Sequence, residues 1–153
     1  MGVSCCQEFN TQIIEILEIH NRKRALHQSP PLKINLELNK LAQECAKKIS
    51  KNEIFVQTFN GEFLGENIYI YKGIEFEVNE MCKEWYDEIK KYDHNCPQYQ
   101  KNTSHFTQMI WRDTKEIGIG IEKKGGICYA VVNYYPPGNI LGEYEDNVFF
   151  KND

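Results

Sequence analysis

A histidine and two glutamates lie in apolar parts of the sequence, where ionisable side chains are uncommon. Glu66 is flanked by apolar residues at the start of a β-branched and aromatic run, and Glu88 falls on the apolar helical stripe of residues 78–92. His105 heads the aromatic-rich run of residues 104–111. A carboxylate that faces a core is stable only if it is hydrogen-bonded, paired or bound to a ligand. A histidine with two carboxylates could activate water or a hydroxyl nucleophile, or contribute to a metal site.

Each of these three residues also has a structural interpretation. Glu88 could lie at the edge of its stripe and pair in solvent with Lys90 or Lys91. Glu66 could accept hydrogen bonds from neighbouring backbone amides, and His105 could be a hydrogen-bonded structural group. The residues are therefore candidates either for a functional cleft or for a polar core that joins a helix to a sheet.

Hydrophobic periodicity predicts the elements that must position these side chains. A first helix carries Phe9 and stops at Ser29, before two prolines, and Asn35 can cap a second helix. The remaining elements are a strand, a third helix and a hairpin whose second strand is central, at residues 68–71, 75–92, and 117–121 with 127–135. Helices on both faces of a small, largely antiparallel sheet give an α/β fold, a three-layer α-β-α sandwich.

Length and charge restrict the class of protein. A chain of 153 residues with 41% hydrophobic content forms one domain with a substantial core. The net charge of −4 excludes a general nucleic-acid binder, which needs an excess of clustered Lys and Arg. Two local basic clusters could still face an anionic surface, one formed by residues 22–24 with His27 and the other by Lys47, Lys48 and Lys51.

The N-terminus indicates lipid attachment. The sequence has no apolar run of the ~18 residues that span a bilayer and no secretory signal, so we expect a protein that is neither secreted nor transmembrane. Gly2 follows Met1 as in myristoylated proteins, although Cys6 occupies the position where the pattern has Ser or Thr. Cys5 and Cys6 would then be palmitoylation sites. The alternative is a disordered terminus with incidental thiols.

The six cysteines do not resemble a disulfide framework. Cys45, Cys82 and Cys128 lie within apolar stretches, which favours reduced thiols in a cytosolic setting. Cys96 is the loop thiol with a histidine nearby, His94, so a metal or nucleophile role at Cys96 remains an alternative. No second Cys or His completes that local site in the sequence.

Four short motifs, in order along the chain, resemble those of the CAP superfamily of cysteine-rich secretory, antigen 5 and pathogenesis-related proteins. They are Gly-Glu-Asn, Trp-Tyr-Asp-Glu, Ser-His-Phe-Thr-Gln and Asn-Tyr-Tyr-Pro-Pro-Gly-Asn, at residues 65–67, 85–88, 104–108 and 133–139. The resemblance implies the CAP fold for residues 9–153, with residues 1–8 as a flexible N-terminus. It also implies a central cavity lined by two glutamates and two histidines, which can bind a divalent metal such as zinc.

Glu66, Glu88 and His105 match three of the four cavity residues, and Gln57 occupies the place of the other histidine. Glutamine is a poor substitute for imidazole as a zinc ligand. We therefore expect no cofactor, and weak or absent zinc binding at His105 unless His94 reaches the site from its loop.

Within the superfamily, the chain is similar to the intracellular Golgi-associated plant-pathogenesis-related type. This resemblance implies a non-enzymatic peripheral protein on the cytosolic face of Golgi or endosomal membranes, with anionic lipids, sterols, protein partners or a second copy as partners. It further implies a regulatory role in trafficking or autophagy. The alternatives are a hydrolase that uses the His/Glu cleft, although the motifs supply no serine or cysteine nucleophile, and a CAP scaffold whose polar cluster is purely structural.

Overall fold

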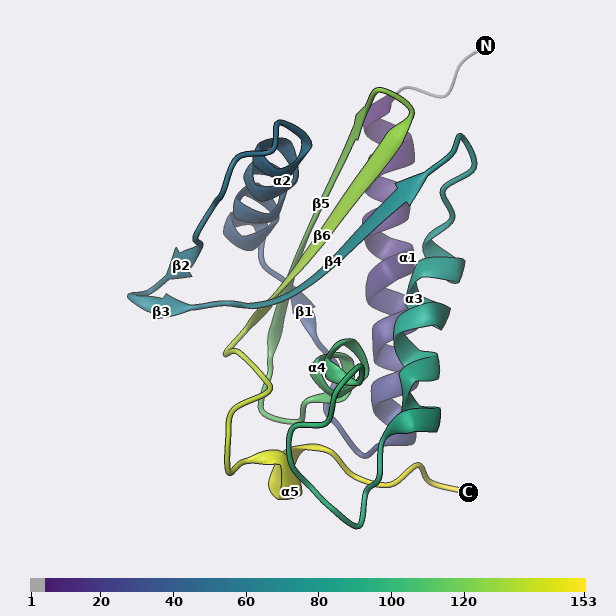
Figure 1. Cartoon of the computed structure of the whole chain (residues 1–153), viewed down its shortest axis with the longest axis vertical. Helices are drawn as coiled ribbons and strands as arrows, with labels where there is room; N and C mark the ends of the chain where they lie inside the picture. Colours follow the sequence, from purple (N-terminus) through teal and green to yellow (C-terminus); the bar gives the residue numbers. More distant parts are fainter. Residues whose placement is uncertain (1–4) are drawn as a thin grey trace.

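The computed structural model describes residues 5–153 and has the predicted three layers (Figure 1). A sheet lies between α2 (Leu36–Ser50) on one face and α1 (Cys5–Leu26) with α3 (Val78–Tyr86) on the other. These layers confirm the predicted α/β sandwich. Within the described residues, no helix combines the length and apolar character needed to cross a bilayer.

The main sheet has the strand order β1-β5-β6-β4. Its strands are β1 (Lys33–Ile34), β4 (Gly65–Lys72), β5 (Glu116–Lys124) and β6 (Ile127–Tyr135). Only β1 pairs in parallel, and the other neighbours are antiparallel. The second strand of the predicted hairpin, β6, is central as expected. Strand β4 is longer than the predicted run of residues 68–71 because its ladder with β6 extends from Gly65 to Lys72.

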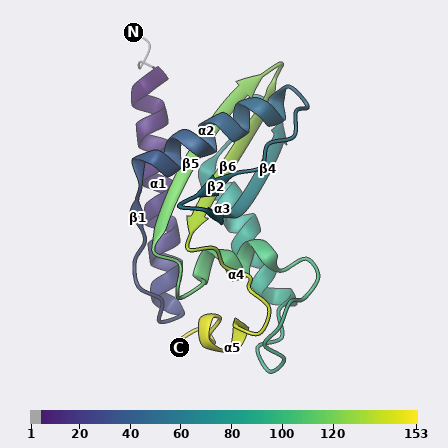
Figure 2. The same ribbon diagram turned by 90° about the vertical axis from the view of Figure 1, so that its left-hand side faces the viewer.

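Helix α2 is fixed closely to the sheet. The Asn35 side chain caps it by accepting hydrogen bonds from the backbone amides of Glu37 and Leu38, as the sequence predicts. Gly118 and Gly120 let the helix approach β5, since a Cβ at Gly118 would lie 2.3 Å from the backbone of Leu38. One face of the sheet is thus covered by a single helix in backbone contact (Figure 2).

Helix α1 begins earlier than expected and buries part of a predicted basic cluster. The sequence predicts a flexible terminus through residue 8, whereas α1 begins at Cys5, with Glu8 favourably placed in the first turn. Arg24 and His27 are fully buried, so they do not face an anionic surface. Arg24 instead donates hydrogen bonds to several backbone carbonyls, among them those of Pro30 and Trp111 at 2.8 Å. It therefore ties α1 to the chain that follows α4.

The predicted third helix is divided. Helix α3 ends at Tyr86 and continues as a 3-10 turn, η1 (Asp87–Lys91), which changes the direction in which Glu88 points. The short helix α4 (Ser104–Ile110) begins at the predicted histidine motif. Two elements were not predicted from the sequence, the small hairpin of β2 (Thr58–Phe59) with β3 (Glu62–Phe63) and the C-terminal turn α5 (Tyr144–Asn147).

Candidate functional site

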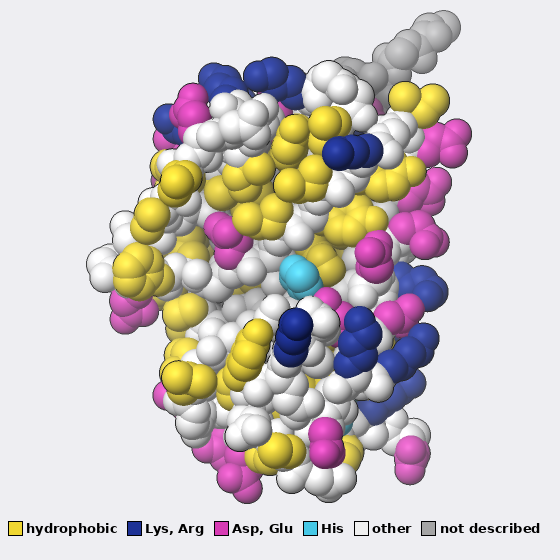
Figure 3. All heavy atoms as spheres, viewed as in Figure 1, with side chains coloured by type: hydrophobic (Ala, Val, Ile, Leu, Met, Phe, Trp, Pro, Cys, Tyr) yellow, Lys and Arg dark blue, Asp and Glu magenta, His cyan; other side chains and the backbone are white. Residues whose placement is uncertain are grey.

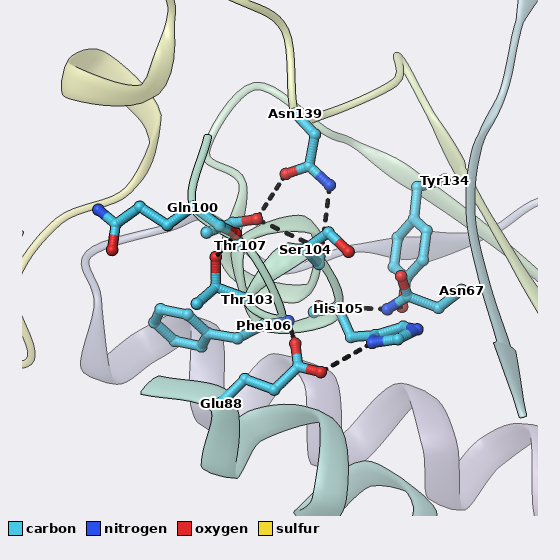
Figure 4. Close-up of polar contacts among 10 residues, drawn as sticks. All are labelled: Asn67, Glu88, Gln100, Thr103, Ser104, His105, Phe106, Thr107, Tyr134 and Asn139. Atoms are coloured by element: carbon cyan, nitrogen blue, oxygen red, sulfur yellow. Dashed lines mark hydrogen bonds and ion pairs between the residues drawn. The ribbon is translucent and has the colours of Figure 1, made fainter. Parts of the chain in front are cut away.

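The histidine motif is joined to η1 by a histidine–glutamate pair (Figure 4). Glu88 accepts from Nδ1 of His105 at 2.8 Å and from the backbone amide of Phe106 at 3.0 Å. The ring of Trp85 stacks on His105 with centroids 5.7 Å apart. The alternative in which Glu88 pairs with Lys90 or Lys91 is wrong, because both oxygens of Glu88 contact α4. Nζ of Lys90 lies 3.8 Å from Oδ2 of Asp87 instead.

His105 combines a fixed orientation with access to solvent. Its side chain is 37% exposed, whereas that of Glu88 is 15% exposed. Because Nδ1 contacts Glu88, Nε2 is the nitrogen available to a ligand. Within residues 5–153, no hydroxyl or thiol group hydrogen-bonds to the His105 ring. The pair is an oriented, accessible imidazole with a carboxylate behind it.

A buried chain of hydrogen bonds holds α4 from behind. Asn67 donates to the backbone carbonyl of His105 at 3.2 Å and to the Tyr134 hydroxyl at 3.1 Å. Tyr134 lies 2.6 Å from Nε2 of His20, whose Nδ1 lies 2.8 Å from the carbonyl of Ile16. Since a carbonyl only accepts, His20 Nδ1 carries the proton and Tyr134 donates to Nε2. Each member of the chain from His20 to His105 thus has a defined donor role.

Burial sets the protonation states in this chain. It lowers the pKa of His20 to about 4 and raises the pKa of Tyr134 well above its ordinary value. Both side chains are therefore neutral at pH 7, which matches the donor roles given above.

The second glutamate is held by amides rather than by a histidine. Gln57 donates through Nε2 to Glu66 at 2.6 Å and to Oδ1 of Asn133 at 3.1 Å, and Asn133 returns a hydrogen bond to Oε1 of Gln57 at 2.7 Å. The thiol of Cys45 lies 3.8 Å from Glu66, and burial together with this carboxylate raises the pKa of Cys45 to about 12. The thiol is consequently a poor nucleophile.

These residues do not fit a zinc ion. Among residues 5–153, no three His, Cys, Asp or Glu side chains lie close enough together to hold a metal. Gln57 presents its NH2 group to Glu66 and its oxygen to Asn133, so neither faces an open ligand position. His94 does not complete the set, because its ring stacks on Phe150 at 4.7 Å.

The sequence predicted Gln57 and the ionisable residues of the site, and it missed the other amides and the aromatic rings that orient them. Asn67 and Asn133 each lie within a recognised motif, and this position was the only signal that they are functional. Tyr134 shares the motif of Asn133, whereas His20 lies outside the four quoted motifs, and a buried histidine cannot be told from a surface one in a helical pattern. Of the lipidation candidates, Gly2 lies outside the described residues, and Cys6 is exposed.

Fold and site together define a three-layer α-β-α domain with a histidine–glutamate pair beside an amide-held glutamate. Residues 17–135 match the family described as "CAP: Cysteine-rich secretory protein family". The chain belongs to the CAP family.

Individual proteins to which the chain is similar include two relatives and one solved structure. The human Golgi-associated plant pathogenesis-related protein 1 is 33% identical over 154 residues, covering 97% of each chain. Protein PRY2 of Saccharomyces cerevisiae is 33% identical over 144 residues, which are 92% of this chain and 41% of that protein. The crystal structure of NaASP2 with Zn2+ has a TM-score of 0.69 at 24% identity and covers 90% of this chain and 84% of that chain, so it supports the fold alone.

Proposed function

We propose that this protein is a non-enzymatic, peripheral membrane CAP protein that binds anionic or sterol-containing membranes on the cytosolic face of the Golgi or endosomes. The observation that carries the proposal is an exposed apolar segment, residues 54–63. In this segment Ile54 is 94% exposed, and Val56 and Phe63 are each 69% exposed. Neighbouring exposed apolar side chains of this kind mark contact sites for lipids or proteins.

The amide cluster holds this segment against the sheet. Gln57, which follows Val56, is 6% exposed and bonds to Glu66 on β4 and Asn133 on β6. The ring of Phe59 packs against Tyr135 with centroids 5.0 Å apart. The outward apolar side chains therefore lie on an anchored segment, so less conformational entropy is lost on binding than for a free loop.

Basic residues precede the apolar segment. Lys47 and Lys51 are exposed at the end of α2, whereas Lys48 pairs with Glu53 at 3.1 Å. Each basic residue near an anionic membrane contributes only about 1 kcal/mol, and the net charge of −4 opposes the attraction of the whole protein to that membrane.

Lipid attachment would supply the main anchor. A myristoyl group at Gly2 would give a membrane partition constant of about 10⁴ M⁻¹, and acylation of Cys5 or Cys6 would supply the second signal for stable anchoring. The name of the human relative supports the Golgi assignment. The proposal includes a regulatory role in trafficking or autophagy, which the resemblance to the Golgi-associated type implies.

The test is flotation of bacterially expressed, unlipidated protein with neutral, anionic and sterol-containing vesicles at two salt concentrations. The variant Ile54→Ser/Val56→Ser/Phe63→Ser should lose most of the binding. Leu141→Ser is the matched control, since Leu141 is 81% exposed outside the segment and its replacement should leave binding unchanged. Equal flotation of the triple variant and the wild type would reject the segment as the lipid contact, and no flotation of either would reject lipid recognition by the domain.

The hydrolase alternative has less support. His105 and Glu88 could act as a base and its orienting partner, but the missing hydroxyl or thiol beside His105 leaves the pair without a nucleophile among the described residues. Ester or peptide turnover that disappears in both Glu88→Gln and His105→Ala would nevertheless reverse the assignment. A purely structural cluster predicts that His105→Ala lowers stability while flotation of the folded variant is unchanged.

A further inference from the structure

A cavity lies at the end of the molecule that is opposite the start of α1 (Figure 1). It has a volume of about 500 Å³, and its walls come from residues 148–152 and from the loop of residues 94–97. Pro97, Val148 and Phe150 supply apolar lining, and Phe150 is 59% exposed. Cavities of roughly 300–1,000 Å³ with apolar walls are typical of ligand sites. This cavity is called the C-terminal cavity below.

The chain that forms one wall of the C-terminal cavity is fixed to the rest of the domain. The backbone amide of Asn152 donates to the carbonyl of Leu26 at 2.7 Å. Nδ1 of His27 donates to the carbonyl of Phe149 at 2.8 Å, since a carbonyl only accepts. The guanidinium group of Arg112 lies 5.0 Å from the centroid of the Phe149 ring. The cavity is therefore preformed, so less conformational entropy is lost when a ligand binds.

Two stacked rings form an aromatic platform at the C-terminal cavity. The ring of Phe150 stacks on that of His94, with centroids 4.7 Å apart and an interplanar angle of 24°. Tyr92 supports His94 by an edge-on contact at 4.8 Å. Burial lowers the pKa of His94, so this ring is neutral at pH 7 and does not repel a cation. The exposed Phe150 ring is thus held in one orientation and can receive an apolar side chain or the face of a guanidinium group.

The surroundings of the C-terminal cavity are acidic. Residues 143–153 contain one basic side chain, that of Lys151, and four acidic ones, those of Glu143, Glu145, Asp146 and Asp153. Glu145 is exposed and lines the cavity. Figure 3 shows acidic and apolar side chains at the lower end of the molecule, whereas Lys and Arg gather higher on the right. This end of the molecule is therefore negatively charged.

We propose that the C-terminal cavity binds a basic peptide segment of a partner protein, which inserts one apolar side chain and places an Arg or Lys beside Phe150 and Glu145. The apolar walls supply the anchor site, because a pocket that buries one large side chain commonly dominates the affinity of an interface. An arginine at this place can lie on the Phe150 ring and pair with the Glu145 carboxylate at once. The acidic surroundings would also attract such a segment during association.

The same charges disfavour other occupants of the C-terminal cavity. An anionic membrane would be repelled by this end of the molecule, and two copies that met here would bring like charges together. The cavity is also distant from Cys6, the described candidate for acylation, which lies at the start of α1 (Figure 1). The inference therefore goes beyond the lipid contact proposed at residues 54–63, and either can fail while the other holds.

The first test is selection from a phage-displayed library of random short peptides on the folded, unlipidated protein, with counter-selection on Glu145→Lys. Because Glu145 is exposed, this variant should fold, and its thermal melt checks that it does. The enriched peptides should carry Arg or Lys within a few positions of an aromatic residue or a leucine. Enrichment of acidic peptides, or of peptides that bind wild type and Glu145→Lys alike, would overturn the proposal.

The second test measures the affinity of a selected synthetic peptide by fluorescence polarisation. Glu145→Lys and Phe150→Ser should each weaken binding about ten-fold, and added salt should weaken it further in the wild type. The matched controls are Glu75→Lys and Ile74→Ser, which change exposed residues of the loop between β4 and α3 at the other end of the molecule. Both controls should bind as the wild type does.

Three outcomes of these measurements would contradict the assignment of the C-terminal cavity. Unchanged affinity in Glu145→Lys and Phe150→Ser would place the peptide elsewhere. Flotation with anionic vesicles that is lost in Phe150→Ser would make this surface a membrane contact instead. Self-association of the protein that is lost in Glu145→Lys would make it a contact between copies.

Discussion

The two halves of the candidate site hold their glutamates in different ways. Glu88 is bound to the imidazole of His105 and to a backbone amide, and α4 is supported by a hydrogen-bonded chain through Asn67 and Tyr134 that ends at His20. Glu66 is bound by Gln57, which is locked to Asn133 by a reciprocal pair of amide hydrogen bonds. One half is therefore linked to a titratable buried histidine, His20, and is called the titratable half, whereas the other rests on amides, which carry no ionisable proton, and is called the amide half.

This difference separates two tasks. The titratable half joins η1 to α4 and to α1, so it fixes helices to one another. The amide half fixes the apolar segment of residues 54–63 to β4 and β6. The resemblance implies a metal-binding cavity at these positions. In this chain, the residues of one half instead join helices to one another, and those of the other half hold the proposed lipid-binding segment in place.

The largest expected effect is that of acid on the titratable half. The pKa of His20 is lowered from 6.5 to about 4 by burial, so the unfolded chain takes up a proton that the folded chain does not. This contribution to stability is complete above pH 6.5 and is lost as the pH falls toward 4, by roughly 3 kcal/mol. Urea unfolding at several pH values measures it. In His20→Gln the free energy of unfolding should fall less steeply between pH 6.5 and pH 4 than in the wild type. An unchanged dependence on pH would show that other groups cause it.

Removal of Glu88 is expected to cost nearly as much at neutral pH. Glu88→Ala leaves Nδ1 of His105 and the amide of Phe106 without their acceptor, which should lower the free energy of unfolding by about 2–3 kcal/mol. The neighbouring Asp87→Ala is the control, because its ion pair with Lys83 is exposed and screened by solvent, so its loss should lower the free energy of unfolding far less. Similar costs for both variants in chemical denaturation would mean that Glu88 is not a special anchor.

The amide half should respond to mutation but not to pH. Asn133→Ala removes both hydrogen bonds to Gln57 and leaves its Oε1 without a donor while Nε2 keeps Glu66, at a cost of about 1–2 kcal/mol. The cost should be the same at pH 7 and pH 5.5, because neither amide titrates. Denaturation of wild type and variant at the two pH values gives this difference, and a cost that varied with pH would contradict the division between the halves.

The smallest expected effect concerns metal binding. Gln57→His would supply the imidazole that the site lacks, and we expect about ten-fold tighter zinc binding than in the wild type, ~1.4 kcal/mol. Calorimetry on metal-free protein measures it, and His105→Ala added to Gln57→His should abolish the gain. Submicromolar zinc binding by the wild type that is lost in His105→Ala would show that the donor set fits zinc after all.

Periodicity and capping residues were sufficient to predict the layers, the central position of β6 and the cap of α2 at Asn35. They failed at the end of α3, because the change from an α-helix to a 3-10 turn leaves the apolar stripe almost unaltered. That change decides whether Glu88 faces solvent or His105. The hairpin of β2 and β3 was missed because each strand has two residues, too few to show alternation.

The candidate site was predictable as a set of residues but not as an arrangement. Glu66, Glu88, His105 and Gln57 were each identified from the sequence, yet their separation into two hydrogen-bonded groups depends on contacts between distant strands and helices. The burial of Arg24 is a similar case, since it depends on hydrogen bonds to the carbonyls of Met109 and Trp111, which lie 85 and 87 residues away along the chain. Sequence charge alone places such a residue on the surface.

The most direct measurement of the central claim is tryptophan quenching by brominated lipids in protein that carries Ile54→Trp. Both native tryptophans, Trp85 and Trp111, are buried at 2% and 0% exposure, so added quenching reports on the new residue. We predict strong quenching with anionic, sterol-containing vesicles, and none beyond the wild-type level for Leu141→Trp. Equal quenching of the two variants, or none for Ile54→Trp when the protein is bound to vesicles, would contradict the assignment of residues 54–63 as the membrane contact.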